Sequence, residues 1–167
     1  MNLIKRLNEL FTIDSSAGTL TRKITCGRRR PAGEIISANG IKSGYKLVNV
    51  DNKMISLHRI IWMMSNGDIP AGVQIDHING NSKDNRLSNL RACTPTQNMM
   101  NKRAYSNNRS GYKGVYYDNS KNYEKKWRAQ ITVEKKQIPL GRFRTPELAY
   151  EAYRKAAIKH FGEFARI

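Results

Sequence analysis

The chain has little cysteine, few acidic residues and no long apolar run. Cys26 and Cys93 lie far apart and form no CxxC pair, so neither a disulfide framework nor a cysteine-based zinc site is indicated. No apolar run reaches the roughly 18 residues that a transmembrane helix needs. The opening MNLIKRLNELF also lacks the apolar region and cleavage site of a signal peptide. We therefore expect a cytoplasmic protein with no membrane partner.

The scarcity of acids leaves a large positive charge. Lys and Arg number 30 against 13 Asp and Glu, which gives a formal net charge of +17 over 167 residues. A surface with such a potential attracts a polyanion. Nucleic acid is the first candidate, because each phosphate that a basic side chain neutralises releases condensed counterions. A merely solvated basic surface is the alternative.

Residues 1–55 mix short β-like stretches with turn residues and predict a small β-sheet. The loop between two of these stretches contains Arg28, Arg29 and Arg30, with no acid beside them. Such a run suits contact with DNA phosphates. A solvated loop is the alternative for these three arginines.

Two helices are predicted in residues 56–102, separated by a short strand and a polar loop. The run LHRIIWMMS, residues 57–65, has an apolar stripe at helical spacing, and Asn66-Gly67 ends it. The second helix follows a start signal in residues 94–97, TPTQ. Thr is the N-cap, Pro takes the first helical position, and Gln stands three residues after the cap.

The residues best suited to chemistry lie between these helices and in the first turn of the second one. Asp76 and His77 end the predicted strand, Asn89 follows twelve residues after His77, and Asn98 nine residues after that. Adjacent strand residues point to opposite faces, so the carboxylate and the imidazole suit different tasks. Hydrolysis of a phosphodiester needs a water deprotonated near neutral pH and a cation at the phosphate. Ordinary turn formation is the alternative for these polar residues.

The segment from Leu57 to Lys102 resembles the HNH endonucleases in the stretches LHRIIW, IDHINGN, DNR..NLR and QN..N. The resemblance implies a ββα-metal core in which His77 is the general base that activates water. It also implies that Asn89 orients the imidazole, through a backbone carbonyl bonded to the Nδ1 proton. Such a bond fixes the tautomer of the ring.

The same resemblance implies that Asp76 and Asn98 bind the metal. Many relatives have histidine where this chain has Asn98, so the chain is similar to the HNN variant of phage homing endonucleases. Two oxygen ligands favour one Mg²⁺ or Mn²⁺ per chain over zinc.

Basic residues also lie within this segment. Arg59, Arg86 and Arg91 are expected to contact the DNA backbone, with surface solvation as the alternative for the last two. His58, beside Arg59, could contact phosphate, support the site or serve the fold alone.

Residues 103–110 predict a basic linker, and residues 111–167 predict three strands followed by an amphipathic helix that starts at Thr145-Pro146. The stretches SGYKGVYYD, WRAQI, LGRF and AYEAYRKAAIKHFG resemble the plant APETALA-two, or ethylene-response-factor, DNA-binding domain. The resemblance implies that the sheet lies in the DNA major groove and that the helix packs behind it. The expected DNA contacts are Lys113, Tyr116, Lys125, Lys126, Trp127, Arg128, Arg142 and Arg144. Core packing is the alternative for the tyrosine and the tryptophan.

Together these patterns predict an α+β protein with the modules 1–55, 56–102, 103–110 and 111–167. The first interpretation is a site-specific, metal-dependent DNA endonuclease of homing type that nicks, because a tethered reader gives a general nuclease core its site. It would act as a monomer on double-stranded DNA, without a small-molecule substrate, in the host-cell cytoplasm if a phage encodes it. The alternative is a catalytically inactive, sequence-specific DNA-binding regulator. RNA binding is a third possibility that the charge permits.

Overall fold

The structure, a computed structural model, describes residues 2–38, 44–102, 108–120 and 124–167. The chain is α+β, as predicted, and its residues group into two compact units, Met1–Pro95 and Thr96–Ile167. The sequence placed the boundary instead at a linker of residues 103–110, of which 103–107 lie outside the described residues. The helix predicted at Pro95 therefore groups almost entirely with the C-terminal residues.

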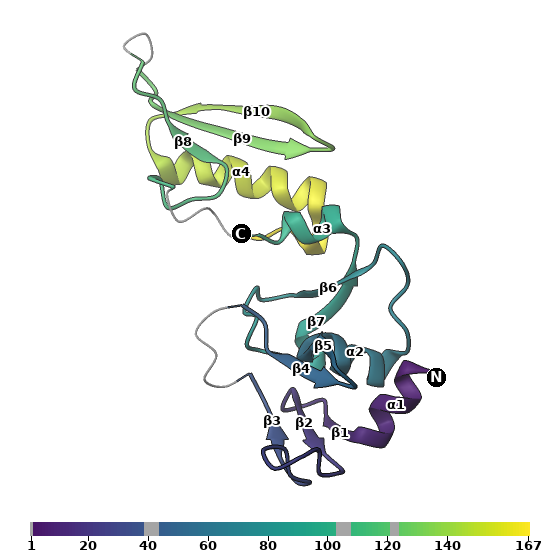
Figure 1. Ribbon diagram of the computed structural model, residues 1–167. Coiled ribbons are helices and arrows are strands. Elements are labelled where there is room, and N and C mark those ends of the chain that lie inside the picture. Colours follow the sequence, from purple (N-terminus) through teal and green to yellow (C-terminus); the bar gives the residue numbers. More distant parts are fainter. Residues whose placement is uncertain (1, 39–43, 103–107, 121–123) are drawn as a thin grey trace. The chain divides into compact units, whose positions relative to one another are not determined.

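The N-terminal part of the first unit contains a helix and small antiparallel sheets (Figure 1). Its described elements are α1 (Leu3–Leu10), β1 (Phe11–Asp14), β2 (Thr19–Arg22), β3 (Ile35–Ile36), β4 (Leu47–Val50) and β5 (Lys53–Ser56). Strands β1, β2 and β3 form one sheet in that order, and β4 pairs with β5. The β-structure predicted for residues 1–55 is present, whereas helix α1 was not predicted.

Helix α1 begins directly after Asn2, whose side chain caps it. The Asn2 side chain accepts hydrogen bonds from the backbone N–H groups of Ile4 (2.9 Å) and Lys5 (3.4 Å), which satisfies two donors of the first turn. Leu7 and Leu10 face the interior from this helix. Only eight residues long, the helix depends on this packing for its stability.

The rest of the first unit contains the predicted catalytic residues. Its elements are α2 (Leu57–Asn66), β6 (Gln74–His77), the 3₁₀ turn η1 (Leu87–Asn89) and β7 (Leu90–Cys93), and helix α3 (Pro95–Met100) crosses into the second unit. Both predicted helices are confirmed, and α2 ends at Gly67, whose φ of 91° suits glycine. Strand β7 pairs antiparallel with β6, so that Asp76 lies opposite Arg91.

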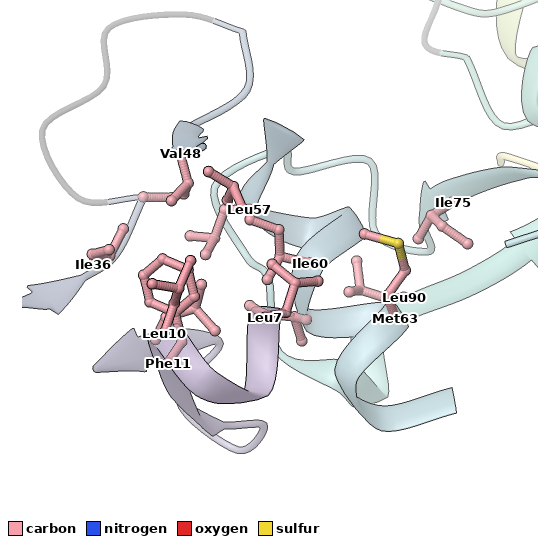
Figure 2. Close-up of a cluster of buried hydrophobic side chains, with 14 residues drawn as sticks. Leu7, Leu10, Phe11, Ile36, Val48, Leu57, Ile60, Met63, Ile75 and Leu90 are labelled. Atoms are coloured by element: carbon pink, nitrogen blue, oxygen red, sulfur yellow. The ribbon is translucent and has the colours of Figure 1, made fainter. Parts of the chain in front are cut away.

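A shared hydrophobic core joins residues 1–55 to the segment that follows them (Figure 2). Leu7 and Phe11 from the N-terminal part pack in it with Ile60 of α2, and Ile75 and Leu90 extend it to the β6–β7 hairpin. Full burial of each such side chain stabilises the fold by about 1.5 to 3 kcal/mol. The N-terminal residues are therefore part of the same folded body as the predicted catalytic residues.

The second unit is a three-stranded antiparallel sheet packed on one long helix, as predicted. Its elements after α3 are β8 (Val115–Tyr117), β9 (Trp127–Val133), β10 (Lys136–Phe143), α4 (Pro146–Phe161) and the 3₁₀ turn η2 (Gly162–Phe164). Thr145 caps α4, because its side chain accepts a hydrogen bond from Leu148 N–H at 3.3 Å. In the described parts of the chain, no helix is long and apolar enough to cross a membrane.

Candidate active site and nucleic-acid interface

Asp76 and His77 end strand β6 and are both buried, at 7 and 4% exposure. Their side chains leave the strand on opposite faces, as the alternation of a β-strand requires. Asp76 meets Arg91 across the β6–β7 pair, whereas the ring of His77 lies near the rings of Tyr45 and His58. The two adjacent residues thus have separate surroundings.

Asp76 forms a nearly buried ion pair. Its Oδ2 atom accepts hydrogen bonds from Nε and Nη2 of Arg91, both at 3.0 Å. A buried carboxylate is costly without a cationic partner, and the guanidinium fork supplies one. Arg91 was predicted to contact the DNA backbone, but in the structure its side chain lies beside the predicted metal ligand. An oxygen donor held at the end of a strand next to an imidazole fits a hard divalent cation such as Mg²⁺ or Mn²⁺.

Two aromatic rings contact the ring of His77. The Tyr45 ring lies nearly parallel to it, with centroids 5.9 Å apart and planes inclined by 19°. The His58 ring is 5.0 Å away and tilted by 60°. Burial lowers the pKa of His58 to about 3, and repulsion from His77 and Arg59 adds to this shift. His58 is therefore neutral near pH 7 and belongs to the surroundings of His77, a role that the sequence left open.

Asn85 is a contact of His77 that sequence reasoning missed. It is 2% exposed, and its Oδ1 atom lies 3.0 Å from Nε2 of His77. The signal was present in the DNR stretch that resembles the HNH endonucleases, but an asparagine in a polar loop is also an ordinary turn residue. Tyr45 was missed because it is distant in the sequence from every other residue of the site.

Asn89 organises the loop that follows His77. Its Oδ1 atom accepts a hydrogen bond from Asn79 N–H at 3.0 Å, and its Nδ2 group donates to the Asp84 carbonyl at 2.7 Å. Its backbone carbonyl, which was expected to contact the imidazole, accepts from Ile78 N–H at 2.8 Å. The buried Asn89 side chain thus closes the loop on itself behind His77.

Asn98 lies on α3 and is partly buried. It belongs to the second unit, and Asp76 belongs to the first. The ion that these two residues were expected to share therefore stays a prediction. Within the described residues, no group of three or more His, Cys, Asp or Glu side chains is arranged to hold a metal ion.

The arginines of the first unit have different surroundings. Arg86 is exposed and makes a bidentate pair with Asp84, at 2.8 and 2.7 Å, which lowers the pKa of that carboxyl to about 2. Arg59 on α2 is half-buried. Arg28, Arg29 and Arg30 are exposed in a turn that is closed by a hydrogen bond from Cys26 N–H to the Arg30 carbonyl, at 2.8 Å.

A cleft of about 390 Å³ opens beside this turn, between β3 and the β4–β5 hairpin. Arg30 and Lys46 contribute positive charge to its wall, and Arg22 pairs there with Glu34 at 2.9 Å. Lys46 follows Tyr45 in the chain, so the cleft begins next to the residue that covers His77.

One face of the C-terminal sheet presents a row of three predicted DNA contacts. Tyr116, Arg128 and Arg142 lie opposite one another on β8, β9 and β10. The guanidinium carbon of Arg128 is 5.9 Å from the centre of the Tyr116 ring. Nη2 of Arg142 is fixed by Asp118 Oδ2 at 2.6 Å, which leaves Arg128 as the exposed arginine of the row.

Other predicted contacts of this unit lie elsewhere. Trp127 packs with Val115 and Ala129 on the helix side of the sheet, which is the packing role weighed as its alternative. The ammonium group of Lys113 donates to the Met100 carbonyl, and burial together with repulsion from Arg166 lowers its pKa to about 8.

The remaining lysines and arginine of this set lie near the β8–β9 connection. Lys126 donates to the Ser120 carbonyl, and Arg144 makes an exposed ion pair with Glu124 at 3.1 Å. Lys125 is exposed.

Part of the chain matches a known protein family. Residues 56–100 match the family model of the HNH endonucleases. An uncharacterized HNH endonuclease of Acanthamoeba polyphaga mimivirus, L560, is 40% identical over 126 residues, covering 74% of this chain and 62% of the relative. Protein 3.8 of Escherichia phage T7 is 36% identical over 109 residues, covering 65% of this chain and 87% of the relative.

The matches cover different shares of the chain and of its relatives. The chain spans 62% of the length of the mimivirus relative and 87% of the phage one. A second mimivirus HNH endonuclease, L245, is 38% identical over 61 residues, which is 34% of this chain and 18% of that protein. No solved structure gives a significant match to the chain.

Proposed function

Because the chain belongs to the HNH endonuclease family, a family of phosphodiesterases that act on DNA, we propose that it is a metal-dependent DNA endonuclease with His77 as its general base. The observation that carries the proposal is the buried pair at the end of β6, in which a carboxylate and an imidazole occupy adjacent positions with separate surroundings. We further propose that a homing-type DNA-binding module selects the site at which the enzyme cuts.

His77 takes a proton from a water molecule, and the resulting hydroxide oxygen attacks the phosphorus of the scissile phosphodiester. The bond from phosphorus to the leaving sugar oxygen breaks, that oxygen takes a proton from solvent, and the imidazolium later releases its own proton to solvent. Asp76, together with Asn98 by its position in the family pattern, would hold one Mg²⁺ or Mn²⁺, whose charge would stabilise the phosphate and the leaving oxygen. Asn89 keeps the loop behind His77 closed through the hydrogen bonds of its side chain.

A plasmid assay tests this function. Supercoiled DNA is incubated with the wild-type chain and with His77→Ala, in Mg²⁺, Mn²⁺ or Zn²⁺. We expect the wild type to nick with Mg²⁺ and Mn²⁺, because one active site per chain cuts one strand. His77→Ala should bind the plasmid without cutting it. Cleavage with zinc alone would contradict the all-oxygen ligand set.

The second unit is proposed to select the site by placing its sheet in the major groove of double-stranded DNA, as in the APETALA-two domains it resembles. The row of Tyr116, Arg128 and Arg142 supports this, because it sets an aromatic ring and two guanidinium groups on the face opposite helix α4. An arginine fork can donate two hydrogen bonds to guanine, one to O6 and one to N7. The tether between the units then raises the local concentration of the nuclease at that site.

The arginine turn and its cleft are proposed to hold the DNA backbone next to the active site. The cleft wall contains Arg30 and Lys46, and Lys46 follows the tyrosine that contacts His77. Replacing Arg28, Arg29 and Arg30 together by Gln should weaken binding to all sequences alike and make affinity less dependent on salt. An unchanged salt dependence of affinity would show that this turn does not contact the DNA backbone.

The alternative, an inactive DNA-binding regulator, is favoured by one observation. Arg91 makes two hydrogen bonds to Oδ2 of Asp76, so a guanidinium already balances the charge of the carboxylate that was expected to bind the cation. If the wild-type chain leaves plasmid supercoiled in Mg²⁺ and Mn²⁺ while it shifts a specific duplex, the regulator is the correct description.

A further inference from the structure

Asn85 is the polar side chain that contacts the ring of His77 from the following loop. It is almost fully buried, at 2% exposure, and its Oδ1 atom lies 3.0 Å from Nε2 of the imidazole. A buried amide in such a place has to satisfy its hydrogen bonds locally, because unmet polar groups are costly. Its contacts therefore restrict both the amide and the ring.

The second contact of Asn85 determines which way the amide points. Its Nδ2 group donates to the Lys83 carbonyl at 3.4 Å, so the amide oxygen is the atom that faces His77. An oxygen can only accept, and the proton of this hydrogen bond must therefore come from Nε2. A neutral imidazole carries one ring proton, so this hydrogen bond fixes both the tautomer and the orientation of the ring.

The position of Asn85 depends in turn on the connection between β1 and β2. Gly18 has a φ of 69°, and a Cβ atom built on it would lie 2.5 Å from the backbone carbon of Asn85 and 2.5 Å from the nitrogen of Arg86. Backbone atoms cannot yield at that separation. Next to this contact, Leu87 N–H donates to the Ser15 carbonyl at 2.9 Å.

Several hydrogen bonds close the β1–β2 turn. Asp14 Oδ1 accepts hydrogen bonds from the N–H groups of Ser16 at 3.0 Å and Ala17 at 2.9 Å, and from the Ser16 hydroxyl at 2.7 Å. The Asp14 carbonyl accepts from Gly18 N–H at 2.9 Å. These bonds fix the conformation of the turn, which the loop at Asn85 contacts through Gly18.

We propose that Asn85 is a positioning residue, which holds the ring of His77 through a hydrogen bond to Nε2, and that the turn at Gly18 sets where Asn85 lies. The inference rests on the proposed function in one respect, the role of His77 as general base. It gives the N-terminal sheet a part in catalysis that is separate from DNA contact.

The first test compares Asn85→Leu, which keeps the size of the side chain without its acceptor, with Asn85→Asp, which keeps the acceptor oxygen. Long-range ¹H–¹⁵N spectra of the full chain, at about pH 8, where a histidine of ordinary pKa is neutral, report which ring nitrogen carries the proton. The His77 signals are assigned from their loss in His77→Ala. We expect Nε2 to be protonated in the wild type and in Asn85→Asp, and this preference to be lost in Asn85→Leu.

Kinetics provide the second readout for the same variants. Asn85→Leu should lower kcat by roughly 10- to 100-fold, the usual effect of losing a group that orients a catalytic residue, while KM for DNA changes little. Asn85→Asp should recover much of this loss. If Asn85→Leu melts at the wild-type temperature and keeps both the wild-type kcat and the wild-type nitrogen pattern, the proposal is overturned.

The third test isolates the turn. Gly18→Ala is compared with Gly72→Ala, because Gly72 also has a positive φ, 80°, but an added Cβ atom there would meet nothing within 4 Å. Both variants bear similar backbone strain, and Gly18→Ala alone pushes on Asn85. We expect a lower kcat and a changed His77 nitrogen pattern only in Gly18→Ala. Equal effects in the two variants would show that the turn at Gly18 does not set the position of Asn85.

The experiments distinguish a failure of the proposed function from a failure of this inference. If His77→Ala cuts plasmid as well as the wild type, His77 is not the base. The nitrogen pattern of His77 and its response to Asn85→Leu would still show whether Asn85 fixes the ring.

Discussion

The ring of Tyr45 lies over the ring of His77, with centroids 5.9 Å apart and planes inclined by 19°. Tyr45 is 52% exposed, whereas His77 is 4% exposed, so the tyrosine separates the imidazole from solvent on that side. Tyr45 therefore covers the ring of His77 on that side.

Replacing Tyr45 should slow cleavage without abolishing it. Stacked aromatic pairs contribute about 0.5 to 1.5 kcal/mol, so Tyr45→Ala should reduce the single-turnover rate by roughly 2- to 10-fold. Tyr45→Phe keeps the ring and should retain most of the rate. DNA affinity, measured by fluorescence anisotropy, serves as the control. A rate for Tyr45→Ala equal to that of the wild type would show that the ring has no part in the reaction.

His58 should make stability depend on pH in a defined window. Its pKa in the folded chain is about 3, well below the ordinary 6.5, so the unfolded chain binds more protons between these values. The stability contribution is complete above pH 6.5 and is lost as the pH falls, by up to about 1.4 kcal/mol per pH unit.

Urea denaturation at several pH values between about 4 and 7.5, compared with His58→Gln, measures this effect. The variant cannot titrate there and should show a shallower fall in unfolding free energy towards acid. The groups nearest to His58 are His77, Arg59 and Tyr45, and all three are retained in the variant. Parallel curves for the two chains would contradict the prediction.

Replacing Arg91 should make the stability of the chain depend more strongly on a cation bound at Asp76. Arg91→Met removes the guanidinium that pairs with the buried Asp76 carboxylate, and breaking a buried ion pair in this way typically costs about 3 to 5 kcal/mol. Added Mg²⁺ or Mn²⁺ should raise the melting temperature of this variant more than that of the wild type, because the metal would replace the missing charge. Arg91→Lys is the matched control. Identical metal-induced shifts in all three proteins would argue that Asp76 does not bind the ion.

Arg128 and Arg144 should differ in their effect on DNA binding. Arg128 is the exposed arginine of the sheet row, and its loss should cost about 1 to 3 kcal/mol on the preferred sequence and relax selectivity at one position. Arg144 pairs with Glu124 at the surface, and Arg144→Ala should weaken binding to all sequences slightly. Binding to a randomised duplex library, followed by sequencing, separates the two effects. Equal selectivity losses would count against the row as a base-reading element.

The signals that identified elements correctly are local ones. Helix α3 begins at Pro95 and helix α4 follows Thr145, as their start signals predict, because a capping side chain or an N1 proline acts within one turn. Helix α2 follows from the spacing of its apolar residues and ends at Gly67. Helix α1 was missed, although Asn2 supplies a cap, because eight residues offer little periodicity.

The order of residues along the chain was enough to place Asp76, His77, Asn89 and Asn98 in a family pattern, because their spacing is itself a linear property. Tertiary structure decided what surrounds His77. Tyr45, His58 and Asn85 reach it from three different segments, and Gly18 supports Asn85 from a fourth. Packing also united residues 1–55 with the segment that matches the HNH family, in a shared core. Such contacts follow from how distant segments bury apolar surface together, and no short stretch of sequence contains that information.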